Sequence, residues 1–414
     1  KRKGSFVESC LAIGAVTEKV YFVHEKEKPK DILHECLLPY AGQIEQDCFT
    51  APNFSMQVER RYNYETTRFE DNTMTELLKS GVRMSVSGIE SYYTCPMQYM
   101  TKNVLKIYPR DDATIVQSNH IGTIVHGMFE HSIKSLMLQY DTLDKLSSFV
   151  DNLDDQKTSE LANEYFVVAC EKSDITDACT PEFERKPGIK IKRIFQKCFK
   201  SALSSCIDSG YLPSFYEYKI GKDSQVIIES KKHEKFEFTG YIDRVDENQS
   251  KQYRILDYKT RNKKIELKKT FAGKQIQLFA YAKFLSDIER KQVVDAGYLS
   301  TALKLDKKGK PIHIEPEYSL LTQDEFNIVT DYVQIMIQKA INEISEGNAN
   351  ALVNSLASRE CSFCVYQAAC SNGGRTPKCK KGRTFGSGKK GDEEVLQAMK
   401  VEVQAKKGVE DSND

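Results

Sequence analysis

The pattern of apolar and polar residues predicts a helical part of the chain followed by a part built from strands. Apolar and aromatic side chains recur at helical spacing over residues 85–99, where Ser85 or Ser87 can cap the helix. A second amphipathic helix is predicted over residues 120–140. Residues 141–210 also follow helical spacing, so we expect a helical insertion ahead of the strands.

Strand patterns begin at residue 214. Four runs have the alternation, or the β-branched and aromatic content, of strands: SFYEYKIG, SQVIIES, KFEFTGYIDRVDE and YRILDYKTR. A helix, KQIQLFAYAKFLSDI, a strand, DAGYLSTAL, and a long amphipathic helix, TQDEFNIVTDYVQIMIQKAINEIS, follow in that order. The short polar link ENQSK between the third and fourth strands predicts a hairpin.

The two ends of the chain are less clearly patterned. Residues 1–84 contain two strand-like runs, CLAIGAV and KVYFVHE, a helix-like run, ILHECLLPYAGQI, and then a polar stretch. Between Arg375 and Lys390 there are seven basic residues and no acid, a run that can contact a phosphate backbone. This composition is more typical of a solvated segment, and we expect a basic, flexible tail over residues 372–414.

The composition is that of a folded protein of a reducing compartment. The chain has 414 residues, enough for two or three domains or one large domain with insertions. Its formal net charge is only +1, so nucleic-acid binding has to depend on local patches. The sequence has neither a signal peptide nor an apolar run of about 18 residues, so we expect a cytoplasmic protein without a membrane segment. Its first residue is Lys, which favours a piece of a longer protein.

Two neighbouring strands carry acids at positions where a structural strand prefers apolar residues. Asp243 lies in the middle of TGYIDRVDE, and Asp257 and Lys259 lie in ILDYKT. Side chains alternate along a strand, so Asp257 and Lys259 share a face. The hairpin brings Asp243 close to Asp257, and two facing carboxylates repel each other unless a divalent cation lies between them.

Such an arrangement meets the requirements of metal-dependent phosphodiester hydrolysis. Carboxylates and a backbone carbonyl hold Mg²⁺ or Mn²⁺, which lowers the pKa of the attacking water. A nearby lysine positions that water and offsets the charge of the phosphorane. An isolated Asp-x-Lys on a strand is more often a surface ion pair worth about 0–1 kcal/mol, so the interpretation depends on the residues around it.

Four other residues bear on this interpretation. Gln277 and Tyr281 are four positions apart, on one face of the predicted helix that follows the hairpin. His126 lies on a largely apolar helix, where a histidine is more often a core residue than a ligand. Glu217 is an acid among aromatic residues, equally consistent with the surface of an edge strand and with a contact to metal or water.

A group of cysteines near the end of the chain predicts a second metal site. Most of the 12 cysteines are spaced singly, as buried thiols are, but Cys361, Cys364 and Cys370 form a C-x2-C-x5-C run. A fourth ligand is needed for tetrahedral zinc or for a cubane iron–sulfur cluster. Cys379 would complete a local zinc knuckle, whereas Cys95 would join the start of the domain to its end. Spacing alone leaves both open.

Six motifs occur together: S-x-S-x-I-x-x-Y-x-x-C-P, G-x3-H, G-x-I-D-R-x-D, ILDYKT, Q-x3-Y and C-x2-C-x5-C. In this order they resemble the RecB-type nucleases of the PD-(D/E)XK superfamily. Within these, they are most similar to the iron–sulfur subgroup, which includes the C-terminal domain of AddB and the CRISPR-adaptation nucleases. Each motif is weak alone, but the six in the family's order are jointly specific.

The resemblance implies an active site and a cofactor set. Lys259 would be the catalytic lysine, and the Q-x3-Y pair would orient that lysine and the DNA. The implied ligands of Mg²⁺ or Mn²⁺ are His126, Asp243, Asp257 and the backbone carbonyl of Leu256. The implied [4Fe–4S] ligands are Cys95, Cys361, Cys364 and Cys370, and the full catalytic set is His126, Glu217, Asp243, Asp257, Lys259, Gln277 and Tyr281.

The resemblance also implies a fold and a domain organisation. The family fold is an α/β, restriction-endonuclease-like mixed central sheet flanked by helices, here with a helical insertion and an iron–sulfur staple. The nuclease domain would span residues 85–371. Within residues 1–84, the run CLAIGAVTEKVYFVHEK resembles the end of a superfamily-1 helicase core. Ala15 would stand there in place of the arginine that contacts ATP, as expected for the degenerate helicase region of AddB-like subunits.

The expected function is that of a metal-dependent DNA exonuclease, the nuclease part of an AddB-type helicase–nuclease in double-strand-break repair. It would act on single-stranded DNA or the ends of linear duplex, together with a partner subunit. One alternative is a non-catalytic DNA-binding or assembly module with a structural zinc or iron–sulfur site. Another is a free-standing exonuclease of a CRISPR system or mobile element. The intact Asp243, Asp257 and Lys259 argue against the non-catalytic module.

Overall fold

The structure is a computed structural model, and the residues that it describes all lie in the second of two compact units, Tyr62–Asp414. They are residues 68–79, 81–108, 118–173, 183–221, 225–300, 316–351 and 388–410, with positions 175 and 180 and short pieces between 353 and 386. The strands, helix and helicase remnant expected before residue 68 lie outside the described residues.

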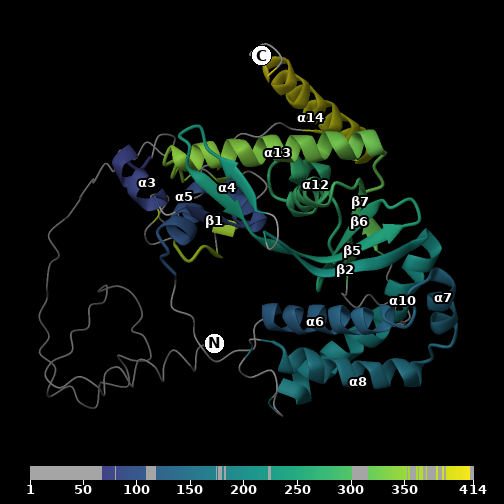
Figure 1. Cartoon of the computed structure of the whole chain (residues 1–414). Helices are drawn as coiled ribbons and strands as arrows, with labels where there is room; N and C mark the ends of the chain where they lie inside the picture. Colours follow the sequence, from purple (N-terminus) through teal and green to yellow (C-terminus); the bar gives the residue numbers. More distant parts are fainter. Residues whose placement is uncertain are drawn as a thin grey trace, which may run out of the picture. The chain divides into compact units, whose positions relative to one another are not determined.

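A five-stranded mixed sheet forms the centre of the described part (Figure 1). The strand order is β2-β5-β6-β7-β8, in which only β6 and β7 run parallel. Helix α12 lies between β6 and β7 in the chain, as the crossover that parallel neighbours require. The strands are β2 (Tyr211–Ile220), β5 (Gly240–Asn248), β6 (Tyr253–Lys259), β7 (Val293–Ser300) and β8 (Glu317–Tyr318), and α12 is Gln277–Glu289.

Helices cover both faces of this sheet, each over its own apolar core (Figure 1). On one side α12 and the long helix α13 (Gln323–Ser345) pack over the sheet, and on the other side lies a helical layer. That layer consists of α6 (Ser118–Met137), α7 (Leu143–Asp151), α8 (Asp155–Glu171), the π-helix η3 (Glu184–Gly188) and α10 (Ile189–Ser209). The mixed sheet flanked by helices is therefore confirmed, and the helical pattern over residues 141–210 corresponds to α7, α8, η3 and α10.

A smaller sheet and the helices around it connect the N-terminal motif to the core. Ser85, rather than Ser87, caps α4, because its Oγ accepts a hydrogen bond from the N–H of Gly88 at 3.1 Å. The sheet has the order β1-β4-β3. Its strands are β1 (Val82–Met84), β3 (Val226–Glu229) and β4 (Lys235–Phe238), and the remaining elements are α3 (Asp71–Leu78), α4 (Val86–Thr94), α5 (Pro96–Tyr99), η2 (Met100–Val104), α11 (Leu267–Phe271), β9 (Val353–Asn354) and β10 (Cys379–Lys380).

The C-terminal region differs from the flexible tail that the sequence predicts. Residues Gly388–Glu410 form the helix α14, which contacts α13 and α11. Val395, Met399 and Val403 are buried in the same core cluster as α12 and α13. The expectation of a flexible tail is therefore wrong for this helix, because three apolar residues at helical spacing outweigh its many charges. No helix among the described residues has the length and apolar character needed to cross a membrane.

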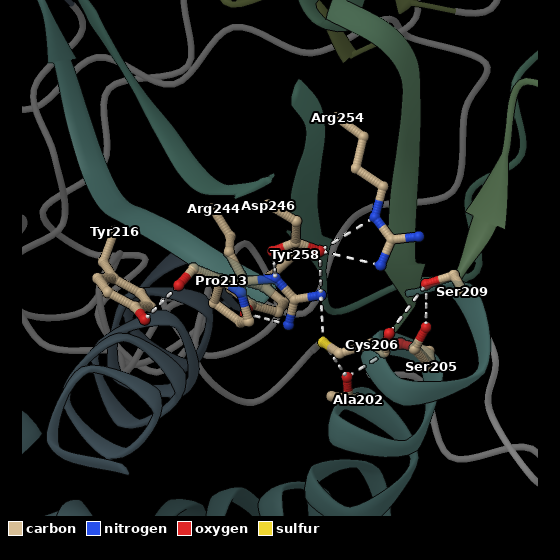
Figure 2. A network of polar contacts seen from close by, with 10 residues as sticks. All are labelled: Ala202, Ser205, Cys206, Ser209, Pro213, Tyr216, Arg244, Asp246, Arg254 and Tyr258. Carbon is tan, nitrogen blue, oxygen red and sulfur yellow. Dashed lines mark hydrogen bonds and ion pairs between the residues drawn. The ribbon is translucent and has the colours of Figure 1, made fainter. Parts of the chain in front are cut away.

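A buried network of charges fixes β5 to β6 and α10 (Figure 2). Both carboxylate oxygens of Asp246 contact Arg244, at 2.8 Å from Nε and 3.0 Å from Nη2. Arg254 of β6 donates its Nε–H to the same carboxylate at 3.1 Å, and its guanidinium lies between the rings of Tyr211 and Tyr318. All three charged side chains are at most 3% exposed. One carboxylate thus serves two guanidiniums in the core.

We predict that Asp246→Asn lowers the free energy of unfolding by about 3–5 kcal/mol, because both guanidiniums keep their charge and lose their buried partner. Urea denaturation of the two proteins measures the difference. The control is Asp287→Asn on α12, whose carboxylate is half exposed and pairs with Lys283 at 3.2 Å. An exposed pair of this kind contributes only about 0–1 kcal/mol. Equal effects of the two substitutions would contradict the prediction.

Candidate active site

A single residue breaks the alternation of strand β2. Phe215 and Tyr218 are three positions apart, yet both contact the core on the side of α12, with ring centroids 5.2 Å apart. Between them Glu217 has a φ of 45°, in the left-handed region that residues other than glycine rarely adopt. Strict alternation from Phe215 would direct Glu217 towards α12. The break directs it to the side of α6 instead.

This break brings Glu217 to Asp243 of β5 and His126 of α6. One ligand atom from each of the three side chains lies within 4.8 Å of the others. His126 Nδ1 is 3.3 Å from Asp243 Oδ2, which also accepts a hydrogen bond from the N–H of Tyr258 at 2.6 Å. Carboxylate oxygens and an imidazole nitrogen are ligands that Mg²⁺, Mn²⁺ and related cations accept in proteins. The three side chains therefore fit a divalent cation.

Asp257 and Lys259 lie beside this cluster at the end of β6. The pairing of β5 with β6 ends at Arg244 and Leu256, and Asp243 and Asp257 are the next residues on the two strands. Asp257 is buried, and its Oδ2 lies 2.5 Å from Lys259 Nζ. Leu256, whose carbonyl is a predicted metal ligand, is fully buried between β5 and β7. The hairpin thus brings both acids and the lysine together.

The electrostatics of the site show that it lacks positive charge. Burial raises the pKa of Asp257 to about 6, and the neighbouring Asp243 carboxylate adds to this effect while Lys259 opposes it. Burial and Asp243 also raise the pKa of Glu217 to about 7. For His126, burial lowers the pKa, but the charge of Asp243 and the hydrogen bond to it outweigh burial and raise it. A bound cation would relieve this repulsion.

Helix α12 supplies the two remaining predicted residues. Gln277 is its first residue, and its side chain hydrogen-bonds that of Tyr281 one turn later. Tyr281 packs against Gly240 so closely that a Cβ at Gly240 would lie 2.9 Å from Tyr281 Cζ. The glycine of the G-x-I-D motif is therefore required, because any side chain would displace the tyrosine. Burial raises the pKa of Tyr281 to about 12, so its hydroxyl stays a neutral donor.

Helix α12 is held in turn by an acid that the sequence interpretation missed. Glu90 of α4 accepts hydrogen bonds on Oε1 from the N–H groups of Ile276, at 2.8 Å, and Gln277, at 3.1 Å. It thereby caps the N-terminus of α12 and fixes the start of the Gln277–Tyr281 pair. Burial raises the pKa of Glu90, and the charges of Lys263 and Lys259 oppose this. Only its place in the N-terminal motif, five residues before Cys95, could have drawn attention to it.

Comparison with known proteins agrees with this geometry. Residues 83–371, more than half of the chain, match the PD-(D/E)XK nuclease superfamily. The chain belongs to this superfamily. The family predicted from the six motifs is therefore confirmed, and so is the α/β fold that it implied.

Curated relatives of this nuclease all bear the name of the same subunit of an ATP-dependent helicase/deoxyribonuclease. The protein of Clostridium tetani is 25% identical over 403 residues, covering 79% of this chain and 33% of the relative. That of Clostridium novyi is 24% identical over 354 residues, covering 69% and 30%. That of Carboxydothermus hydrogenoformans is 27% identical over 246 residues, covering 56% and 22%. The chain spans about a third of the length of the first two relatives.

The predicted cysteine ligands of this nuclease lie near one another. Cys95 ends α4 and precedes α5, and its pKa is raised to about 11, mainly by burial and further by Cys370, Cys361 and Cys364. The structure therefore brings the distant Cys95 to the C-x2-C-x5-C run. Such a thiol is protonated at neutral pH, and coordination to a metal would remove its proton. Cys379 lies in β10, and its side chain is outside the described part of the structure.

We predict that Asp257→Asn stabilises the metal-free protein at pH 8 by about 1–3 kcal/mol, because the folded state then no longer holds an ionised buried acid. The raised pKa fixes the direction. The folded wild type binds a proton at Asp257 more tightly than the unfolded chain, so this acid costs no stability below about pH 4. The cost grows as pH rises and is complete above the folded pKa of about 6.

Thermal unfolding in EDTA at pH 8 and near pH 4.5 tests this dependence on pH. The melting temperature of Asp257→Asn should exceed that of the wild type at pH 8, with a smaller difference at the lower pH. Asp287→Asn serves as the control, because its exposed carboxylate lies far along α12 from the site. A lower melting temperature for Asp257→Asn at pH 8 would show that the repulsion is absent.

Proposed function

We propose that this nuclease is a metal-dependent DNA exonuclease that hydrolyses phosphodiester bonds at DNA ends with Mg²⁺ or Mn²⁺. The observation that carries the proposal is the cluster of His126, Glu217 and Asp243 beside the Asp257–Lys259 pair. The choice of DNA as substrate is supported by the relatives, which are named deoxyribonuclease subunits.

The residues of the site have distinct roles in this proposal. His126, Glu217, Asp243 and Asp257 would hold the cation, which lowers the pKa of a bound water and neutralises phosphate charge. Lys259 is held by Asp257 at the rim of the site, where its ammonium can orient the attacking water and offset the negative charge that develops on the phosphorane. The neutral hydroxyl of Tyr281, fixed by Gln277, can donate to a phosphate oxygen.

We further propose that the chain is the nuclease part of an AddB-type helicase–nuclease in double-strand-break repair, which works with a partner subunit. The names of the relatives and the share of their length that the chain spans support this setting. The nuclease domain would be residues 85–371, with a helicase remnant before it. The complete set of acids with the lysine favours catalysis over a non-catalytic assembly module.

We predict that Asp257→Ala and Lys259→Ala each lower the rate of DNA hydrolysis by at least about 10²-fold, as removal of groups that stabilise transition-state charge does. The measurement is the release of label from 5′- and 3′-labelled linear DNA with Mg²⁺ or Mn²⁺. Circular dichroism of each variant checks its fold. Asp287→Ala, which removes an exposed acid of α12, is the control and should cut at the wild-type rate. Full activity in Asp257→Ala would refute the assignment.

A [4Fe–4S] cluster bound by Cys95, Cys361, Cys364 and Cys370 is the second part of the proposal. The support is the approach of Cys95 to the other three thiols, and thiolates are the ligands that such clusters use. The cluster would brace the fold by joining α4 to the chain that follows α13.

We predict that anaerobically purified protein is brown, and that Cys95→Ala bleaches it as completely as Cys364→Ala, because each removes one of four ligands. Visible absorption and iron content per chain are the measurements. Cys198→Ala removes a buried thiol from α10 and should keep the iron. Loss of iron in Cys379→Ala, with iron retained in Cys95→Ala, would instead favour a local zinc-knuckle type of site.

A further inference from the structure

Two strands present four chemically distinct side chains to the side of α6. On β5, Ile242 is buried in the core beside α12 and Gly240 touches Tyr281 of α12. The residues that alternate with them, Tyr241 and Asp243, therefore face the other side. On β2, Tyr218 and Ile220 contact the same core, so Glu217 and Lys219 face the side of α6. Two of these four residues form the proposed metal site, and two have no assigned role.

The two unassigned residues, Lys219 and Tyr241, are direct neighbours. They are partners in the register of β2 and β5, and Lys219 Nζ lies over the Tyr241 ring, 5.9 Å from its centroid. Tyr241 is 51% exposed and Lys219 is also exposed. The pair thus combines an open aromatic ring with a cation on one surface. A large aromatic residue at this level of exposure has little to gain from the core.

Their position relative to the proposed metal site follows from the strand geometry. Lys219 lies two residues beyond Glu217 on β2, and Tyr241 lies two residues before Asp243 on β5. Two residues of a strand span about 7 Å, so the pair lies one step along the ladder from the acids and on the same side of the sheet. A ligand that reaches the metal can therefore reach this pair as well.

A ring and a cation at this spacing suit a nucleic-acid strand. Single strands are bound through stacking of their bases on aromatic side chains and through contacts of lysine or arginine with phosphates, largely without regard to sequence. The ammonium covers one face of the ring, and the rest of its exposed surface is available to a base. The same pair offers nothing comparable to a carboxylate ligand or to a second metal ion.

We propose that Tyr241 and Lys219 form a nucleotide subsite next to the scissile phosphate, in which a base stacks on the Tyr241 ring and a backbone phosphate pairs with the Lys219 ammonium. The inference rests on the proposed nuclease function and adds a residue pair that binds substrate without taking part in hydrolysis. It also predicts single-stranded DNA as the form bound at this position, because a base inside a duplex is not free to stack on a side chain.

The test is steady-state hydrolysis of a short single-stranded oligonucleotide by the full chain. Tyr241→Leu should raise KM by about tenfold, within the range expected for the loss of one stacked base, with kcat changed less than about twofold. Tyr241→Phe keeps the ring and should restore most of the wild-type KM. Lys219→Gln should reduce the slope of log affinity against log salt by about 0.7, the loss of one phosphate contact with a single strand. Lys219→Arg should keep that slope.

Lys235→Gln provides the matched control, because Lys235 is an exposed lysine on β4 outside the proposed subsite. Its KM and salt slope should equal those of the wild type. An unchanged KM in Tyr241→Leu would overturn the subsite while leaving the nuclease assignment intact.

If the wild-type protein fails to cut DNA with any divalent cation, the proposed function fails instead. In that case, binding of a fluorescent oligonucleotide, measured by anisotropy without metal, still decides the subsite. Equal affinity of the wild type and Tyr241→Leu would exclude it.

Discussion

The repulsion between buried carboxylates is the constraint on which the rest of this structure depends. Asp243, Asp257 and Glu217 come from three strands and share one small region with His126. Burial and mutual repulsion raise the pKa values of Asp257 and Glu217, so the metal-free site stores unfavourable electrostatic energy. The surrounding fold must hold these acids in place against that repulsion, and a cation of charge two would convert it into binding energy.

Several interactions keep the acids in place. The N–H of Tyr258 holds Asp243, and the ammonium of Lys259 holds Asp257. Immediately before these residues, the buried Asp246 joins Arg244 of β5 to Arg254 of β6, which fixes the register of the two strands (Figure 2). A slip of one residue would exchange the two faces of the strand, so this register decides whether the acids meet. The charged network in the core thus supports the charged site at its edge.

Local rules predicted the parts of the site that depend on regular geometry. Asp257 and Lys259 share a face because strands alternate, and Gln277 and Tyr281 contact each other because they are four residues apart on a helix. Glu217 stayed ambiguous because its direction depends on a left-handed residue inside a strand, which no spacing rule anticipates. The packing of α14 was missed for a related reason. Its charges dominate the sequence, whereas three apolar residues decide where it binds.

Glu90 shows why long-range contacts lie beyond such rules, and how the cysteines bear on the active site. Its partners, Ile276 and Gln277, lie 186 and 187 residues away in the chain. Helix α4 carries Glu90 near its middle and ends at Cys95, only five residues later, which is about 7.5 Å along a helix. A cluster at Cys95 would therefore fix α4, α4 would fix the N-terminus of α12 through Glu90, and α12 would fix Tyr281 against Gly240. Through this chain of contacts, a metal centre that takes no part in hydrolysis can still set the position of a residue in the active site.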